Sequence, residues 1–209
     1  MVMDFTHPIE AVIPGVQGRV LAILAETSAE LNLRTIARLA DVSIAQASRV
    51  LPPLVDLGVV ERREVPPASQ FRFVPDHIAA RPLLALSRAR DGVVREMGMA
   101  ADGLSVKPVS VVLFGSLARG EADASSDIDV VFVRPAGVDE SDDDWVSSIQ
   151  QWKDSIGRVS GNTIEVLDVG SDEVVSRLAG EQQVWRDIRR HGLVVHGLDL
   201  HELMDGADA

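Results

Sequence analysis

Residues 111–133 read VVLFGSLARGEADASSDIDVVFV, and this stretch decides how the second half of the chain folds. It begins as an apolar run typical of a buried strand and stops at Gly115-Ser116. A polar loop follows, and a second apolar run starts with Asp127 and Asp129. Residues two apart in a strand point to the same face of a sheet. We therefore expect the two carboxylates to project together, with their Cα atoms about 6.5–7 Å apart.

Two carboxylates this close repel each other unless a cation lies between them. Magnesium suits such a pair, because it binds a few carboxylates and leaves positions for water and substrate phosphates. A calcium loop would need oxygen ligands at fixed positions around a central glycine, and no such frame starts at Asp123 or Asp127. A solvated acidic turn would explain Asp123, but not two acids that lead into the apolar run VVFV.

Gly115-Ser116 directly follows the first strand and opens a predicted helix, whose free backbone amides suit a phosphate. Glycine lets the backbone approach a ligand closely, and the Ser116 hydroxyl adds a donor. A phosphate-binding turn followed by a metal-binding carboxylate pair is what nucleotidyl transfer from a nucleoside triphosphate requires.

Such chemistry usually uses a third carboxylate on a neighbouring strand, and the run NTIEVLDV offers Glu165 for it. Asp168, three residues further on, would face the other side of a regular strand. Arg119 would either contact the triphosphate or cap its own helix. The arginines near the end of the chain would either contact phosphate or complement a helix C-terminus, and these are Arg186, Arg189 and Arg190.

The spacing of these residues resembles a known signature. Gly115-Ser116, ten intervening residues and Asp127-Ile128-Asp129 match the GS-x10-D-x-D pattern of the DNA-polymerase-β-like nucleotidyltransferase superfamily. The surrounding segment looks like the small prokaryotic branch, the minimal nucleotidyltransferases, over about residues 90–200. The resemblance implies that Asp127 and Asp129 bind Mg²⁺ or Mn²⁺, and that Glu165 is the third ligand or the base. Relatives more often carry aspartate at that third position.

The same resemblance implies the substrates. The protein would transfer a nucleoside monophosphate, first of all AMP from ATP, to a hydroxyl acceptor and release pyrophosphate. The minimal branch is associated with toxin–antitoxin pairs in which a HEPN-type partner is modified, so a protein acceptor is the first expectation. A small-molecule acceptor is the alternative. The net charge of −11 on residues 76–209 disfavours a nucleic-acid acceptor.

Residues 15–75 predict three helices followed by a β-hairpin. Apolar residues recur at helical spacing in each helix, and Ile44 is expected to face the core of the third. Ser43 and Gln46 have the spacing of a capping box that opens this third helix, and Gly58 ends it. The alternating runs VVERREV and QFRFV form the hairpin. This order is that of a winged helix-turn-helix.

The phrase LRTIARLADVSIAQASRVLPPLVDLGVVERRE resembles the sequence shared by bacterial regulators of the MarR and ArsR types. Pro52-Pro53 departs from that pattern, because relatives usually carry Lys or Arg there, and is expected to kink or break the third helix. If this part binds operator DNA, the contacts would come from Gln46, Ser48 and Arg49 in the major groove and from Arg62, Arg63 and Arg72 on the backbone. A net charge of −1 over residues 1–75 gives little bulk attraction to DNA. The alternative is a module for protein interaction or dimerisation.

The whole chain is expected to have an α/β (α+β) architecture in three parts. These are a winged helix-turn-helix domain at 1–78, a connector helix at 79–104 and a nucleotidyltransferase domain with a mixed sheet flanked by helices at 105–209. Cysteine is absent, which excludes disulfides and makes a reducing cytoplasm the expected location. No run reaches the ~18 apolar residues of a membrane span. A homodimer is a further expectation, because winged-helix proteins often dimerise.

Overall fold

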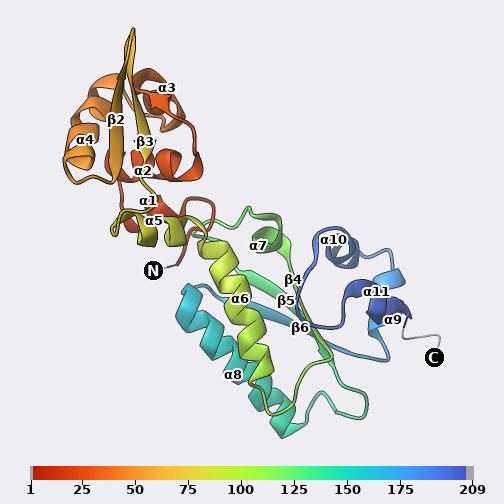
Figure 1. Cartoon of the computed structure of the whole chain (residues 1–209). Coiled ribbons are helices and arrows are strands. Elements are labelled where there is room, and N and C mark those ends of the chain that lie inside the picture. Colours follow the sequence, from red (N-terminus) through yellow and green to blue (C-terminus); the bar gives the residue numbers. More distant parts are fainter. Residues whose placement is uncertain (1, 206–209) are drawn as a thin grey trace. The chain divides into compact units, whose positions relative to one another are not determined.

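The computed structural model describes residues 2–205 and divides into two compact units (Figure 1). His7–Ala89 form the first, which we name the hairpin unit. The first six residues and the chain from Arg90 onward form the second, which we name the sheet unit. Within the part of the chain described, no helix is both long enough and apolar enough to cross a membrane.

The hairpin unit consists, in chain order, of α1 (Pro8–Val12), α2 (Val16–Glu26), β1 (Leu31–Asn32), α3 (Leu33–Leu39), α4 (Ile44–Asp56), β2 (Val60–Val65), β3 (Ala68–Phe73) and α5 (Ala80–Ser87). β2 and β3 form an antiparallel hairpin, and β1 pairs with the other edge of β3. Buried side chains from α2, α3, α4 and the hairpin form one core. The predicted helices and hairpin are therefore present in the predicted order.

Helix α4 begins and ends as the sequence predicts. The Ser43 hydroxyl accepts a hydrogen bond from the Gln46 N–H at 3.1 Å, and the Gln46 side-chain oxygen accepts one from the Ser43 N–H at 2.9 Å. This reciprocal pair is the capping box. Gly58 follows the helix with φ +83°, the left-handed conformation that glycine adopts without strain.

Contrary to expectation, the prolines do not break α4, and Ile44 is not buried. The helix continues through Pro52 and Pro53 to Asp56, because Leu51 and Leu54 on either side are buried in the core and hold both turns in place. Ile44 is 50% exposed instead of buried. It lies in the first turn, beyond the part of the helix that the core covers.

The sheet unit consists of α6 (Ala89–Asp102), β4 (Ser110–Phe114), α7 (Gly115–Arg119), β5 (Ile128–Arg134), α8 (Asp143–Ser160), β6 (Ile164–Gly170), α9 (Val174–Ala179), α10 (Gln183–His191), β7 (Leu193–Gly197) and α11 (Leu200–Asp205). The strand order is β6-β5-β4-β7. β5 and β6 are parallel, whereas β4 pairs antiparallel with both β5 and β7. The predicted mixed sheet is thus confirmed, with helices on both faces (Figure 1).

Alternating side chains of the strands divide between these two faces. Phe132 packs edge-on against Trp152 of α8, with ring centroids 5.0 Å apart. Val131 and Val133 point the other way, into a cluster with Trp185 and Ile188 of α10. The face that α10 covers is the important one for the site, because Asp129 lies on it, two residues before Val131.

The segment expected to form one connector helix contains two. α5 ends at Ser87 and buries Ala80 in the core of the hairpin unit. α6 then buries Val93, Met97 and Ala101, within the sheet unit. The apolar residues of this segment therefore serve two different cores, and the chain turns at Arg88 between them.

The first residues of the chain pack into the sheet unit. The backbone amides of Phe5 and Thr6 both donate to the Ala122 carbonyl, at 2.9 and 3.1 Å. The buried side chain of Asn162 accepts from the Met3 N–H at 3.3 Å and donates to the Met3 carbonyl. The hairpin unit is consequently an insertion in the sheet unit, between Thr6 and Arg90.

The indole of Trp152 supplies a test of the sheet-unit core. It is fully buried and donates from Nε1 to the Met97 carbonyl at 3.0 Å. We expect Trp152→Ala to lower the free energy of unfolding by about 3–5 kcal/mol, because it leaves a large cavity and removes a buried hydrogen bond. Val146→Ala on the same helix, at a side chain 51% exposed, should change it by less than about 0.5 kcal/mol. Urea denaturation measures both, and equal losses would contradict the assigned packing.

Candidate functional site

The turn between β4 and α7 brings its backbone directly against a carboxylate. Gly115 has φ +71°, and a Cβ built on it would overlap Oδ2 of Asp129. Asp129 is the cross-strand partner of Phe114, the residue just before this turn. Position 115 therefore requires glycine for two reasons. The backbone is left-handed there, and the Asp129 carboxylate fills the space that a Cβ would need. Ser116, the next residue, is half-buried.

The three candidate carboxylates lie together at one end of the parallel strand pair. Asp129 of β5 stands opposite Glu165 of β6 in the register, so their Cα atoms are separated by about one strand spacing of 4.8 Å. Asp127 immediately precedes β5, two residues before Asp129. Asp127 and Glu165 are exposed, and Asp129 is half-buried.

Asp168 confirms the predicted alternation of β6. Its carboxylate accepts hydrogen bonds from the Trp145 indole of α8 at 2.9 Å and from Arg134 at 2.7 Å. It therefore lies on the opposite face of the sheet from Glu165, away from the three candidate carboxylates. On that face it pairs with Arg134 beneath α8.

The electrostatics of this group favour a bound cation. Burial raises the pKa of Asp129 above its ordinary value, and the charges of Asp127 and Glu165 raise it further, against the opposing effect of Arg119. Carboxylate oxygens are the ligands that Mg²⁺ and Mn²⁺ prefer, so the donor set fits such an ion. Within residues 2–205, no three acidic or histidine side chains converge closely enough to hold an ion as they stand. The exposed side chains of Asp127 and Glu165 would turn toward Asp129 to do so.

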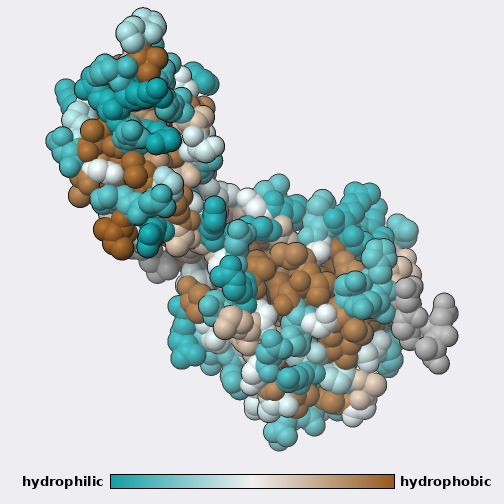
Figure 2. Space-filling model, in the orientation of Figure 1, coloured by the Kyte–Doolittle hydropathy of each residue, from teal (hydrophilic) through white to brown (hydrophobic). Residues whose placement is uncertain are grey.

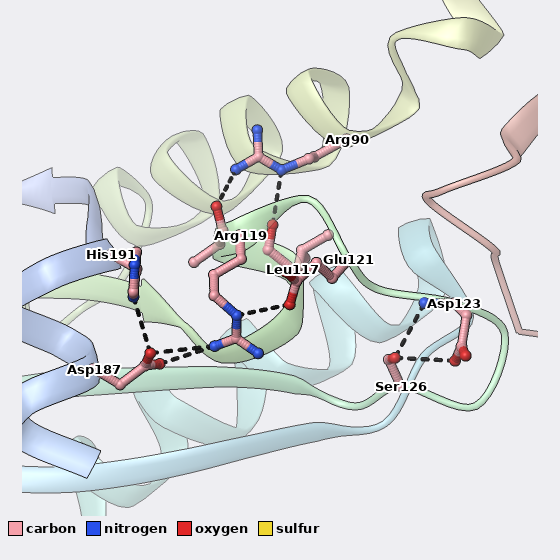
Figure 3. Close-up of polar contacts among 9 residues, drawn as sticks. Arg90, Leu117, Arg119, Glu121, Asp123, Ser126, Asp187 and His191 are labelled. Carbon is pink, nitrogen blue, oxygen red and sulfur yellow. Dashed lines mark hydrogen bonds and ion pairs between the residues drawn. The ribbon is translucent and has the colours of Figure 1, made fainter. Parts of the chain in front are cut away.

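Arg119, at the end of α7, is held by two acids (Figure 3). Its Nε donates to Glu121 at 2.8 Å, and its Nη1 donates to Asp187 of α10 at 3.1 Å. The carboxylate of Asp187 is also 3.0 Å from Nδ1 of His191, one turn further along the same helix. From α6, Arg90 donates to the Leu117 carbonyl at 2.7 Å and so fixes the last turn of α7.

A cleft of about 880 Å³ opens between the turn and α10. Its volume is that of a small-molecule site. The lining consists of Phe114, Gly115 and Arg119 together with Gln183, Val184, Arg186, Asp187, Arg190 and His191 of α10. Four of the six candidates for phosphate contact line this one cleft, namely Gly115, Arg119, Arg186 and Arg190. Arg189 does not line this cleft, because its guanidinium donates to the carbonyls of Leu178 and Gly180.

Sequence reasoning did not identify Asp187 and His191 as parts of this site. They lie 58 and 62 residues beyond Asp129 in the sequence and reach it only because α10 folds back against α7 and β4. The one available signal was their spacing of four residues on a helix, which places both on the same face.

The candidate DNA-contacting residues of the hairpin unit are exposed, but most already have partners. Gln46 is part of the capping box, and the Ser48 hydroxyl donates to the Ala45 carbonyl at 2.9 Å. The arginines of the hairpin are each paired with a glutamate, namely Arg62 with Glu64, Arg63 with Glu30 and Arg72 with Glu61. On the face seen in Figure 2, the hairpin is mainly hydrophilic. Arg49 is exposed on α4 and has no acidic partner within residues 2–205.

Comparison with known proteins agrees with this geometry. Residues 101–189 match the family model of the nucleotidyltransferase domain. The chain therefore contains such a domain. Residues 18–64 match the IclR helix-turn-helix domain, which supports the predicted helix-turn-helix, whereas the resemblance to the MarR and ArsR types stays a prediction.

A solved structure described as "a putative nucleotidyltransferase from Sulfolobus solfataricus" is 18% identical to this chain. The similarity covers 51% of this chain and 82% of that one, with a TM-score of 0.29. No curated protein matches the sequence significantly.

Gly115 and Gly120 together test whether the turn is shaped by the Asp129 carboxylate. Both have φ near the left-handed minimum, at +71° and +75°, but a Cβ at Gly120 would meet nothing within 4 Å. We expect Gly120→Ala to cost about 1 kcal/mol of unfolding free energy for backbone strain alone. Gly115→Ala should cost clearly more, because Asp129 must also move. Denaturant unfolding at neutral pH compares them, and equal losses would show that Asp129 does not press against the turn.

Proposed function

We propose that the sheet unit transfers a nucleoside monophosphate from a nucleoside triphosphate to a hydroxyl acceptor. AMP from ATP is the first choice of donor. The observation that carries the proposal is the register of β5 and β6, which sets Asp129 beside Glu165 and next to the Gly115 turn. The match of residues 101–189 to the nucleotidyltransferase domain supports the same reaction class.

Each residue of the site has a role in this reaction. Asp127, Asp129 and Glu165 would hold Mg²⁺ or Mn²⁺, which supplies charge stabilisation to the triphosphate and to the attacking oxygen. The backbone of Gly115, the Ser116 hydroxyl and the Arg119 guanidinium would bind phosphate oxygens in the cleft. Donors fixed in this way stabilise the charge that develops on the α-phosphate during transfer.

The reaction balances without a further reactant. The acceptor oxygen forms a bond to the α-phosphorus, and the bond from that phosphorus to the oxygen bridging to the β-phosphate breaks. Pyrophosphate leaves with the bonding electron pair. The proton of the acceptor hydroxyl passes to a carboxylate oxygen of Glu165, the exposed member of the pair on β5 and β6.

A protein is the acceptor we propose, in line with the resemblance to minimal nucleotidyltransferases that modify HEPN-type toxins. The charge of −11 on residues 76–209 opposes a polyanionic acceptor such as RNA or DNA.

Metal binding and label transfer test the proposal together. Purified protein is titrated with Mn²⁺ and followed by electron paramagnetic resonance, and is then incubated with α-labelled ATP, Mg²⁺ and the product of the neighbouring gene. We expect Asp127→Asn and Asp129→Asn to weaken Mn²⁺ binding at least 10-fold and to reduce label transfer at least 100-fold, because each removes a ligand charge.

Asp123→Asn is the matched control. Asp123 lies in the same loop, but its carboxylate bonds only locally, to Ser125 and Ser126. It should leave both readouts within about twofold of the unaltered protein. Full Mn²⁺ binding by Asp129→Asn would refute the metal site.

A second candidate function is that of a DNA-binding regulator, in which the transferase site binds nucleotide or partner without turnover. The match of residues 18–64 to a helix-turn-helix domain favours it. Arg49 is then the principal contact, since the hairpin arginines are already paired with glutamates.

Arg49→Ala tests this second candidate on the DNA upstream of the protein's own gene. We expect about 10-fold weaker binding, because a base contact is worth about 1–3 kcal/mol. Arg81→Ala on α5 removes the same charge from an exposed position outside α4 and should have little effect. Fluorescence anisotropy at two salt concentrations provides the measurement. Binding that neither Arg49→Ala nor added salt weakens would argue against operator recognition by α4.

A further inference from the structure

Asp187 is an acidic side chain within a basic cleft. Of the residues that line this cleft in the described chain, it alone is acidic, whereas Arg119, Arg186 and Arg190 are cationic. Its side chain is 25% exposed, so it is accessible to a ligand in the cleft.

The contacts of Asp187 are made with the same groups that would bind phosphate. Nη1 of Arg119 lies 3.3 and 3.1 Å from its two carboxylate oxygens. The backbone N–H of Gly115 also helps to lower the pKa of this carboxyl. Figure 3 shows Arg119 and His191 pointing to Asp187 from two sides. The carboxylate thus occupies the donors of the phosphate-binding turn.

The charge on Asp187 persists at neutral pH. Burial raises the pKa of this carboxyl, but the hydrogen bond with His191 and the positive charge of Arg119 outweigh burial, and the pKa lies below its ordinary value. Arg119 is therefore neutralised by two anions, since its Nε also donates to Glu121 at 2.8 Å. The same carboxylate repels Asp129, whose pKa it helps to raise.

We propose that Asp187 is an internal competitor for phosphate. In the free protein its carboxylate binds Arg119 beside the Gly115 turn, and a polyphosphate must displace it to reach both groups. His191, already 3.0 Å away on the same helix, receives the displaced carboxylate. The inference rests on the proposed function, because it takes Arg119 and Gly115 as phosphate ligands.

Competition of this kind lowers the affinity of the cleft for every anion that binds these donors. Carboxylate and phosphate oxygens bind the same charged donors. The apparent affinity for an anion is therefore its intrinsic affinity multiplied by the fraction of protein in which Asp187 has released these donors. A triphosphate offers more oxygens to the cationic groups of the cleft than a single phosphate does, and is expected to bind more tightly. The competition would therefore reduce occupancy of the cleft by weakly bound orthophosphate, while the ratio of the two affinities stays the same.

Calorimetric titration of the full chain with inorganic tripolyphosphate, in the presence of Mg²⁺, tests the proposal. Asp187→Asn keeps the size of the side chain but removes its charge, and should bind tripolyphosphate about 10-fold tighter than the unaltered protein. Orthophosphate binding should also increase. Glu181→Gln is the matched control, because Glu181 is exposed, precedes α10 and does not line the cleft. It should remain within about twofold.

Unchanged or weaker tripolyphosphate binding by Asp187→Asn would overturn the proposal and would make Asp187 a positioning residue for Arg119. Absence of tripolyphosphate binding in every variant would overturn it as well. Asp187→Ala, with a thermal unfolding curve for each variant, guards against a misfolded Asp187→Asn.

The Arg119→Ala background shows whether the effect passes through Arg119. There, replacing Asp187 should change tripolyphosphate affinity by less than about twofold, since coupled residues lose their mutual effect when one is removed. Tightening that persists in this background would overturn the proposed competition for Arg119. Tightening in the unaltered background together with no label transfer would leave the competition intact and would refute only the proposed function.

Discussion

The parallel register of β5 and β6 is the constraint on which the rest of the site depends. It sets Asp129 opposite Glu165, and the antiparallel pairing with β4 sets Asp129 opposite Phe114. A slip of one residue would turn a strand over and carry its carboxylate to the face that α8 covers. The apolar residues of both strands prevent this, because Phe132 and Val131 are buried on opposite faces and would each lose their cover. The core therefore holds together carboxylates that repel one another.

Much of this arrangement was predictable from local sequence. The glycine-serine turn, the aspartate pair and the side on which Glu165 and Asp168 lie all follow from strand periodicity and from spacing along the chain. The capping box and the glycine that ends α4 follow from equally short-range rules. Each of these features is fixed by residues within a few positions of one another.

The remaining features depend on residues distant in sequence. Asp187 reaches the turn only through the packing of α10, and no short pattern reports that. The connector segment contains enough apolar residues for one amphipathic helix, yet they divide between two cores, which only the assembled units reveal. The helical spacing of Ile44 from the buried residues of α4 fits burial, but Ile44 lies outside the part of the helix that the core covers. Some glutamate partners of the hairpin arginines lie on the neighbouring strand. Glu61 of β2, for example, stands opposite Arg72 of β3 and pairs with it.

The contacts of Phe5 and Asn162 have a consequence for how this protein can be divided. A transferase fragment that begins after the hairpin unit would lack residues 2–6. In the intact chain these residues pair with Ala122 and Asn162. The amide of Asn162, buried in the intact protein, would then lose partners it cannot replace without water. A fragment that keeps residues 2–6 together with residues 90–205 would retain both sets of contacts. The boundary of the sheet unit therefore cannot be drawn at a single point of the chain, because its fold uses residues on both sides of the hairpin unit.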